Sequence, residues 1–391
     1  MIISRAPVRF SLGGGGTDLP SYYQRFGGFV VSAAIDSYVY ITANKRFYDD
    51  IRLAYSQTEI VPNVESIQHR IFREALRMTG VTRAIELTSV ADVPANSGLG
   101  SSSSFTVALL NALHAYKREF VSSRQLAEEA CELEMVRLGE PIGKQDQFIA
   151  AFGNVTAMTL ETDGTVHVEP VPVRDEVLDE LTNNLVIMWS GVERSASAVL
   201  ADQGARVEKK DGATVEGMHR IKALGREVYE LLVKGDTDRY GELLHEHWTN
   251  KRKLSSKMTD DRIDEHYAAA RQAGAIGGKL MGAGGGGFFY HSSCDEPGIA
   301  GIVKVVRAGY PEAAALDRRH RYYDPKSDPA SPTWYSVDVK LERRIEPVIG
   351  LESLRKHAHG ALSGMLILRR GNRLSITPVT RDEWDFILSL E

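Results

Sequence analysis

The sequence has little cysteine, no long apolar run and no excess of positive charge. Its 391 residues include two cysteines, Cys131 and Cys294, too few for a disulfide framework or a cysteine-rich zinc site. No stretch reaches the roughly 18 apolar residues of a membrane-spanning helix. No apolar core follows Arg5 as it would in a signal peptide. The formal net charge of −5 argues against a nucleic-acid-binding surface. We therefore expect a cytoplasmic protein without a nucleic-acid or membrane partner.

Glycine, by contrast, is abundant and gathers in three clusters. They lie at 13–16, at 98–100 within a serine-rich segment, and at 277–287. Glycine lets a backbone approach a ligand closely, although a single cluster is also compatible with a flexible turn. The third cluster formally matches a dinucleotide fingerprint, but a predicted strand follows it where that fingerprint requires a helix. If the fold brings the three clusters together, they form one cleft lined by backbone amides.

The second cluster predicts an anion site. Residues 94–104 form a glycine- and serine-rich segment that runs directly into the apolar residues 105–116. This pattern predicts a loop that leads into a helix N-terminus, where unpaired N–H groups and the helix dipole favour a phosphate. The serine hydroxyls add hydrogen-bond donors and metal ligands. The segment therefore predicts a site for the phosphates of ATP.

Two of the acidic residues between the second and third clusters are candidate site residues, Glu134 and Asp146. A predicted helix from about residue 123 to 138 puts Glu134 on the same face as Ala127 and Cys131. A carboxylate on an apolar face loses hydration unless it is paired or bound to a cation, although a glutamate at the edge of such a face can also reach water. Asp146 lies in the polar segment 140–152, which we expect to be a loop.

The rest of the chain alternates predicted strands and helices. Predicted strands cover 2–12, 84–90, 185–189, 279–281 and 288–291, with a strand pair over 29–42 interrupted near Asp36, two strands over 154–171 joined at Asp163–Gly164, and a hairpin over 365–379. Predicted helices cover 66–79, 101–116, much of 196–232, 240–256, 261–273 and 381–390.

Three segments in this order resemble the motifs of the GHMP kinase superfamily. They are Arg5–Asp18, Pro94–Ser104 and Gly278–Phe288. Within the superfamily the sequence is most similar to the D-glycero-D-manno-heptose 7-phosphate kinases, through Gly13–Asp18, Ile35–Ile41, Ala54–Ser56 and Lys253–Lys257. The resemblance implies a two-domain α+β fold, like ribosomal protein S5 domain 2 over 1–175 and ferredoxin-like over 176–341. Residues 342–391 form an additional segment that the resemblance does not cover.

The resemblance also implies a site for ATP and Mg²⁺. Asp146 is the implied base and Arg9 its partner or a stabiliser of the transition state. Ser102 and Glu134 are the implied Mg²⁺ ligands, with Ser101 the next choice. The implied contacts to ATP are Pro94, Ser97, Gly98, Leu99, Gly100, Ser101, Ser102 and Ser103. The implied contacts to the sugar are Gly14, Gly15, Gly16, Thr17, Asp18, Arg194, Lys253, Lys279, Gly284 and Gly285.

The implied activity is phosphorylation of the anomeric hydroxyl of a heptose 7-phosphate to the 1,7-bisphosphate, for nucleotide-activated heptose biosynthesis. Arg194, Lys251, Arg252, Lys253 and Lys279 are candidate cations for the 7-phosphate, and a solvated helix face is the alternative for 251–253. Two other functions remain open. One is a fucokinase-like enzyme that acts on an unphosphorylated sugar, and the other is a non-catalytic sensor of sugar and nucleotide. The sequence does not fix the oligomeric state.

Overall fold

The structure of the chain is a computed structural model in which two compact units are described separately. The described residues are 1–95, 97–189, 196–209, 211–237, 239–254, 259, 261–272, 274–281, 288–292, 298–311, 335–365, 368 and 379–390. The units are Met1–Cys294 and Asp295–Glu391. The divisions expected after residues 175 and 341 differ from this one. In particular, 341/342 lies inside a single strand, β12 (Tyr335–Gly350).

The first unit is organised around the 18-residue strand β2 (Gly28–Lys45) of a seven-stranded sheet. Strand β1 (Ile2–Gly13) runs antiparallel along one edge of β2. The two halves of the other edge pair with β6 (Val155–Leu160) and β5 (Ile85–Ala91). Strands β3 (Ile51–Ala54), β4 (Thr58–Val61) and β7 (Val166–Pro170) complete the sheet. β2 runs as one strand through the expected interruption near Asp36, but its ladders to β1, β5 and β6 leave residues 35–37 without a paired partner, so the interruption is a break in the pairing and not in the strand.

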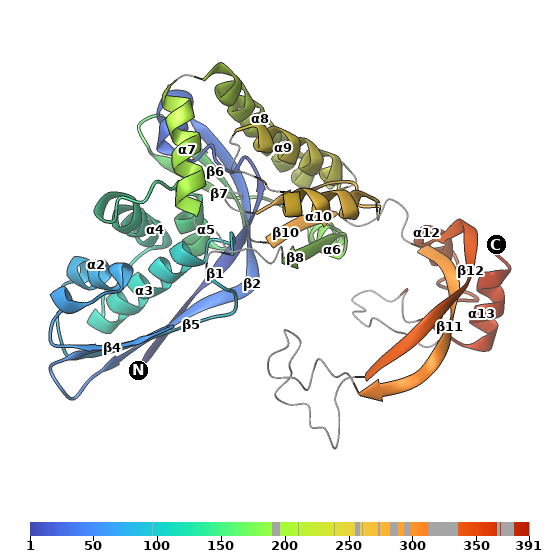
Figure 1. Ribbon diagram of the computed structural model, residues 1–391, viewed down its shortest axis with the longest axis horizontal. Coiled ribbons are helices and arrows are strands. Elements are labelled where there is room, and N and C mark those ends of the chain that lie inside the picture. The colour runs from blue at the N-terminus through green and yellow to red at the C-terminus, as the bar shows by residue number, and fades with distance from the viewer. Residues whose placement is uncertain are drawn as a thin grey trace. The chain divides into compact units, whose positions relative to one another are not determined.

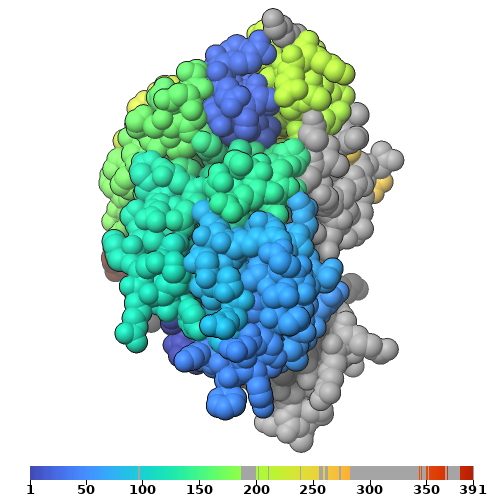
Figure 2. All heavy atoms as spheres, turned by 90° about the vertical axis from the view of Figure 1, so that its left-hand side faces the viewer, coloured from blue at the N-terminus to red at the C-terminus, as the bar shows by residue number. Residues whose placement is uncertain are grey.

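Helices cover this sheet and supply most of its core. They are α1 (Pro20–Phe26), α2 (Arg70–Thr79), α3 (Ser101–Lys117), α4 (Ser123–Cys131), α5 (Gln145–Phe152), α6 (Asp175–Asn183), α7 (Ala196–Glu208), α8 (Gly212–Lys234), α9 (Tyr240–Leu254) and α10 (Asp261–Gln272). Helices α2 to α5 lie along one side of the sheet (Figure 1). Helix α3 buries Leu109, Leu110 and Leu113 completely against it. Helices α1 and α7 pack together at one end of the face seen in Figure 2.

A second, three-stranded sheet contains β8 (Leu185–Trp189), β10 (Phe288–Ser292) and β9 (Gly278–Leu280), in that order. One hydrophobic core contains both Val8 of β1 and Leu224 of α8. Residues on both sides of the expected 175/176 division therefore share a core, and the first unit is a single body. Among the helices that the structure describes, none has the length and apolar composition needed to cross a bilayer.

Helix α5 is the main local difference from the sequence-based expectation in the first unit. The polar composition of 140–152 predicts a loop, but helix begins at Gln145 and continues to Phe152. The helix has a short apolar face, since Phe148 and Ile149 are buried. The polar residues before them obscure this face in the sequence. Asp146 consequently lies in the first turn of a helix, where its position is fixed more firmly than in a loop.

The second unit contains a long hairpin of β11 (Gly298–Pro311) and β12, which pair from Gly298↔Gly350 to Pro311↔Tyr335. Helices α12 (Leu351–Arg355) and α13 (Arg381–Leu388) follow, and α13 begins with a capping box between Thr380 and Glu383. The small core consists of Ile345, Ile349, Leu354, Leu362, Met365 and Ile387. Most of the hairpin expected over 365–379 lies outside the described residues.

Candidate active site

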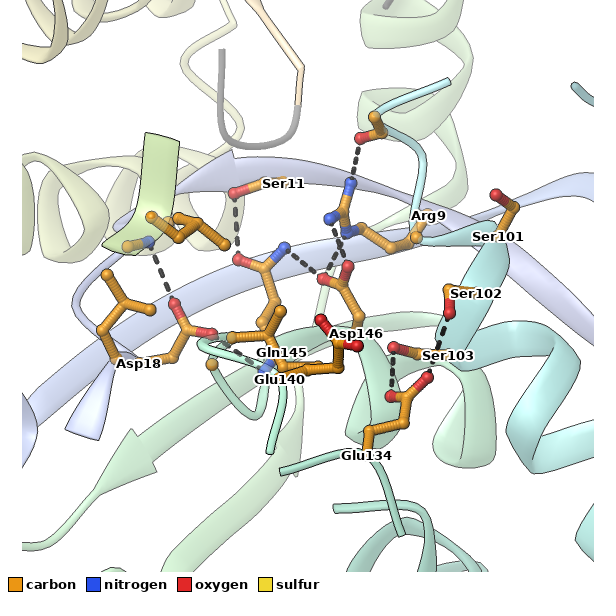
Figure 3. A pocket seen from close by; sticks show the side chains of 18 of the residues that line it. Arg9, Ser11, Asp18, Ser101, Ser102, Ser103, Glu134, Glu140, Gln145 and Asp146 are labelled. Atoms are coloured by element: carbon orange, nitrogen blue, oxygen red, sulfur yellow. Dashed lines mark hydrogen bonds and ion pairs between the residues drawn. The ribbon is translucent and has the colours of Figure 1, made fainter. Parts of the chain in front are cut away.

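A cavity of about 480 Å³ opens between the loop after β1, the start of α3 and the start of α5 (Figure 3). The predicted site residues that line it are Arg9, Gly15, Gly16, Asp18, Gly98, Gly100, Ser101, Ser102, Ser103, Glu134 and Asp146. The first two glycine clusters therefore border one cavity. Most of the third cluster, 282–287, falls outside the described residues.

Arg9 and Asp146 form the centre of this site although 137 positions separate them. Nε and Nη2 of Arg9 donate to the two carboxylate oxygens of Asp146 at 2.8 and 2.6 Å. Such a two-point contact fixes the plane of the carboxylate as well as its position. Nη1 donates to the Gly98 carbonyl oxygen at 2.6 Å, and the Arg9 backbone N–H donates to the Leu99 carbonyl oxygen at 2.9 Å. Arg9 therefore connects the carboxylate to the predicted phosphate loop.

A register shift in β1 helps to place Arg9. Pro7 pairs with Tyr38 and Arg9 pairs with Ala34, so the ladder between β1 and β2 is irregular at this point. Such bulges re-aim side chains and are frequent beside active sites. At the same place the Arg9 N–H bonds to the phosphate loop. The irregularity thus gives one residue both a backbone and a side-chain contact to that loop.

The N-terminus of α3 has the features of an anion site. Gly100 precedes the helix in a left-handed conformation, with φ of 77°, and no side chain caps the helix. The hydroxyl of Ser104 instead donates to the carbonyl oxygens of Pro7 and Gly100. A Cβ at position 100 would lie 3.1 Å from Oδ2 of Asp146. The first-turn N–H groups and the dipole of a 17-residue helix are therefore available to a phosphate close to Asp146.

Glu134 is buried beside these serines, with 2% of its surface exposed. It lies in η2 (Glu132–Arg137), a π-helical turn that continues α4, and such turns often occur at functional sites. Its carboxylate accepts hydrogen bonds from Ser102 at 3.2 Å, Ser103 at 2.8 Å and Thr106 at 2.9 Å, and from Gln147 at 2.6 Å. Burial raises the pKa of Glu134, although these donors oppose the shift.

The first glycine cluster forms a tight loop around Asp18. Oδ1 of Asp18 accepts from the Gly16 N–H at 2.9 Å, and Oδ2 accepts from the Gln145 N–H at 3.0 Å. Burial raises the pKa of Asp18. Thr17 is fully buried, and its hydroxyl bonds the carbonyl oxygens of Gly14 and Phe29. Thr17 therefore holds the loop against β2, while Asp18 lines the cavity.

The other predicted residues differ in burial and in whether they line the cavity. Pro94 is exposed at the start of the phosphate loop, whereas Ser97 and Leu99 are buried beneath it. Lys253 is exposed on α9, and Arg252 pairs with Asp264 at 2.7 Å. Of the three basic residues at 251–253, Lys251 is the one that lines the cavity. Lys279 is buried in β9. Arg194, Gly284 and Gly285 lie outside the described residues.

Three residues that organise the site escaped sequence reasoning. The Gln145 side chain accepts from Ser11 at 3.1 Å, and Gln147 bonds Glu134. A Cβ at Gly143 would lie 1.9 Å from Oδ2 of Asp18, so only glycine fits there. A helical reading of 145–152 would have found the two glutamines, because they flank Asp146. The requirement for Gly143 depends on a contact 125 positions away.

The residues present fit a magnesium ion. Ser102 Oγ and Glu134 Oε1 lie 3.2 Å apart at the helix N-terminus, and Mg²⁺ prefers such oxygen ligands. Among the described residues, no group of three or more His, Cys, Asp or Glu side chains gathers around a possible metal position. Mg²⁺ commonly uses one or two protein ligands, with phosphates and waters supplying the rest. Figure 3 shows Ser102 directed towards Glu134 and Ser101 directed away from it.

Comparisons with known proteins show which proteins the first unit is similar to. Residues 64–154 match the GHMP kinases N-terminal domain. D-glycero-alpha-D-manno-heptose 7-phosphate kinase from Campylobacter jejuni is 29% identical over 298 residues, which cover 72% of this chain and 86% of that protein. The crystal structure of a D-glycero-D-manno-heptose 1-phosphate kinase from Bacteroides thetaiotaomicron has a TM-score of 0.63 and 26% identity. That match covers 75% of this chain and 88% of the other.

The comparisons also reveal a domain that the sequence analysis did not anticipate. Residues 252–390 match the EVE domain. Human thymocyte nuclear protein 1 is 42% identical over 118 residues, or 29% of this chain, and the chain spans about half the length of that relative. Nucleic acid is a candidate ligand of an EVE domain. The expectation of no nucleic-acid partner, which rested on overall charge, therefore does not extend to this domain.

The two matched domains account for most of the chain, and the site lies entirely in the first unit. That unit holds a helix terminus suited to a phosphate, a serine and a glutamate suited to Mg²⁺, and a carboxylate suited to act as a base. The fold is that of the GHMP kinases. The first unit therefore contains a GHMP kinases N-terminal domain and is similar to the heptose phosphate kinases, and the chain is an ATP-dependent sugar kinase.

Proposed function

We propose that the first unit transfers the γ-phosphoryl group of ATP to the anomeric hydroxyl of a heptose 7-phosphate, giving the 1,7-bisphosphate. The observation that carries the proposal is the Asp146 carboxylate, which Arg9 holds at two points beside the N-terminus of α3. Similarity to a kinase named for heptose 7-phosphate supports the choice of sugar. A second relative is named for the 1-phosphate, so the position of the phosphate on the substrate needs direct measurement.

In this mechanism Asp146 accepts the proton of the anomeric hydroxyl. The sugar oxygen then forms a bond to the γ-phosphorus as the bond to the ADP oxygen breaks. An anomeric hydroxyl is more acidic than an ordinary alcohol, so a carboxylate is an adequate base. Arg9 keeps the carboxylate in position, and the amides at the start of α3 hold the phosphates of ATP. Mg²⁺ bound by Ser102 and Glu134 would neutralise charge on the phosphates.

The sugar would occupy the part of the cavity lined by Gly15, Gly16 and Asp18. Each oxygen of Asp18 already accepts one backbone N–H, which leaves a further lone pair on each for a sugar hydroxyl. The buried carboxylate would gain from these added donors, because burial raises its pKa. Asp18 would thus orient the sugar while Asp146 takes the proton.

The test is a coupled assay of ADP release with heptose 7-phosphate, the unphosphorylated heptose and L-fucose, with the position of the new phosphate identified by ³¹P NMR. Asp146→Asn is expected to lower turnover by at least about 100-fold, because general-base catalysis contributes that much. Full turnover by this variant would contradict the role of Asp146. Equal use of L-fucose and heptose 7-phosphate would contradict the proposed specificity, and tight binding without turnover would favour a sensor.

A further inference from the structure

The buried face of α9 and the neighbouring strand β9 bring together three basic side chains, one of which lines the cavity. His247 and Lys251 are one helical turn apart on α9, and Lys279 lies in β9. Their exposed fractions are 2%, 8% and 2%. Lysine is rarely buried to this extent. Lys251 lines the cavity, whereas Nζ of Lys279 contacts the Leu12 carbonyl oxygen at 3.5 Å.

The charged groups around Lys251 come from three other elements. Arg9 of β1, Asp18 of the first glycine loop and Asp146 of α5 all act on it. Burial and the charge of Arg9 lower the pKa of Lys251 to about 8, while the two carboxylates oppose the shift. The Lys251 amine therefore stays largely protonated near neutral pH. The two carboxylates that support its charge, Asp18 and Asp146, are those that the proposed mechanism uses.

The two neighbouring basic groups lack this support from carboxylates. Burial, with the charges of Lys251 and Arg9, lowers the pKa of Lys279 well below its ordinary value. Burial and the charges of Lys279 and Lys251 likewise lower the pKa of His247. Both ring nitrogens of His247 are buried without a hydrogen-bond partner. Within this cluster Lys251 is thus the group best placed to keep a positive charge and to present it to the cavity.

Three of the five N–H donors of Arg9 already bond to Asp146 or Gly98. Phosphoryl transfer places charge on three equatorial oxygens, which positioned cations stabilise. We propose that Lys251 is a catalytic residue whose ammonium group donates a hydrogen bond to the phosphoryl group in transfer. This proposal rests on the proposed function and separates Lys251 from the candidate cations for a phosphate already on the sugar.

In the proposed step Lys251 keeps its protons. The hydroxyl proton goes to Asp146, the sugar oxygen bonds to the γ-phosphorus, and the bond between that phosphorus and the ADP oxygen breaks. The ammonium group stabilises the negative charge on the equatorial oxygens of the phosphoryl group in the transition state. Because only the protonated amine can do this, kcat should fall as the pH rises through about 8.

The experiment compares kcat and KM for Lys251→Met and Lys251→Arg with phosphorylated and unphosphorylated heptose. Lys251→Met should lower kcat by about 100-fold with both sugars, as removal of one transition-state donor does elsewhere, and leave both KM values nearly unchanged. Lys251→Arg should lose less activity and also lose the decline of kcat near pH 8, because arginine stays protonated. Lys234→Met is the matched control, since Lys234 is exposed on α8 and pairs with Glu230 at the surface.

The possible outcomes separate three explanations. A raised KM for the phosphorylated sugar alone would make Lys251 an anchor for the substrate phosphate and overturn the proposal. Wild-type kcat that stays constant to pH 10 would also overturn it, even if Lys251→Met fails to fold. If Lys251→Met retains wild-type turnover of the sugar, the catalytic role of Lys251 is wrong, but the proposed function is unaffected. Absence of sugar-dependent ADP release by the wild type would remove the proposed function as well.

Discussion

Replacing Glu134 by glutamine should stabilise the fold in the absence of metal while it weakens Mg²⁺ binding. The wild-type carboxylate is 2% exposed, and burial raises its pKa in spite of four hydrogen-bond donors. The fold therefore favours the neutral form of this side chain relative to water. Glutamine is a neutral side chain of nearly the same shape. It removes the cost of the buried charge and retains one oxygen acceptor for the neighbouring serines.

The expected gain is about 1 kcal/mol, of the order of the desolvation penalty of one buried polar group. Gln147 makes the exchange tolerable, because its Oε1 is buried without a partner. Rotation of the Gln147 amide would allow that oxygen to accept from the new amide group. For a unit of this size the gain corresponds to a rise of roughly 2–3 °C in the unfolding midpoint.

The pH dependence of this gain has a definite sign. In wild type, the stability associated with the raised pKa of Glu134 is present below the ordinary pKa of a glutamate and is lost as the pH rises through the folded-state pKa. The glutamine variant does not titrate at this position. The difference between the two proteins should therefore be largest near neutral pH and should disappear in acid.

Added Mg²⁺ and ADP should reverse the order of stability. A ligand at 100 times its Kd stabilises the native state by about 2.7 kcal/mol, and the variant should receive only part of this gain. Thermal unfolding in EDTA and in Mg²⁺ with ADP measures both effects. Glu132→Gln is the control, because Glu132 lies in the same π-helical turn with a half-exposed side chain that pairs with Arg137 at 3.4 Å. A Glu134→Gln protein that is less stable in EDTA, or that gains as much from Mg²⁺, would refute the reasoning.

Two further substitutions test the first glycine loop. Gly143→Ala should cost about 1–3 kcal/mol of stability through overpacking, because the new Cβ would meet Oδ2 of Asp18 at 1.9 Å. It should impair sugar turnover more than ADP binding, and equal losses in a kinetic and calorimetric comparison would contradict this. Thr17→Val should cost about 1–3 kcal/mol because it leaves buried polar groups unsatisfied, including the Phe29 N–H at 3.1 Å from Thr17 Oγ1. Thr17→Ser should restore most of the loss in denaturant unfolding, and failure to do so would assign the effect to the methyl group.

Local patterns in the sequence predicted the parts of the site that depend on a single element. The helix expected over 101–116 matches α3, which ends at Lys117. The apolar neighbours of Glu134 correctly predicted that it lies on a buried face. The contact of Arg9 with Asp146 could not be read from local pattern, because it joins a strand to a helix 137 positions away. The GHMP kinase resemblance offered that pairing as one of two roles for Arg9, which periodicity could not do.

Helix phase explains why the basic segment 251–253 was ambiguous. Adjacent lysine and arginine residues give no indication of which side chain points inwards. In the structure His247, Lys251 and Leu254 share the buried face of α9 at spacings of four and three residues. That phase is set by the apolar residues before and after the segment, among them the fully buried Trp248. Lys253 consequently faces solvent, although composition alone does not distinguish it from Lys251.

The second unit was harder to anticipate because its strands are long and irregular. β11 and β12 contain several glycines and charged residues, and their ladder has four register shifts. Such interruptions blur the simple alternation that predicts a strand. The expected boundary at 341/342 therefore fell within β12. Helix α13 was predictable, since the pair Thr380 and Glu383 is a recognisable start signal.

The position of β10 in its sheet determines where the chain can be cut into two fragments without disrupting that sheet. The EVE match begins at residue 252, but β9 and β10 lie beyond that point and belong to the first unit. β10 is the middle strand of its sheet and is hydrogen-bonded to both β8 and β9. Separation before residue 252 would remove both strands and Lys279, and would expose the edge of β8. A cut after Cys294 keeps the sheet whole. The boundary given by the EVE match, at residue 252, therefore differs from the boundary between the two compact units.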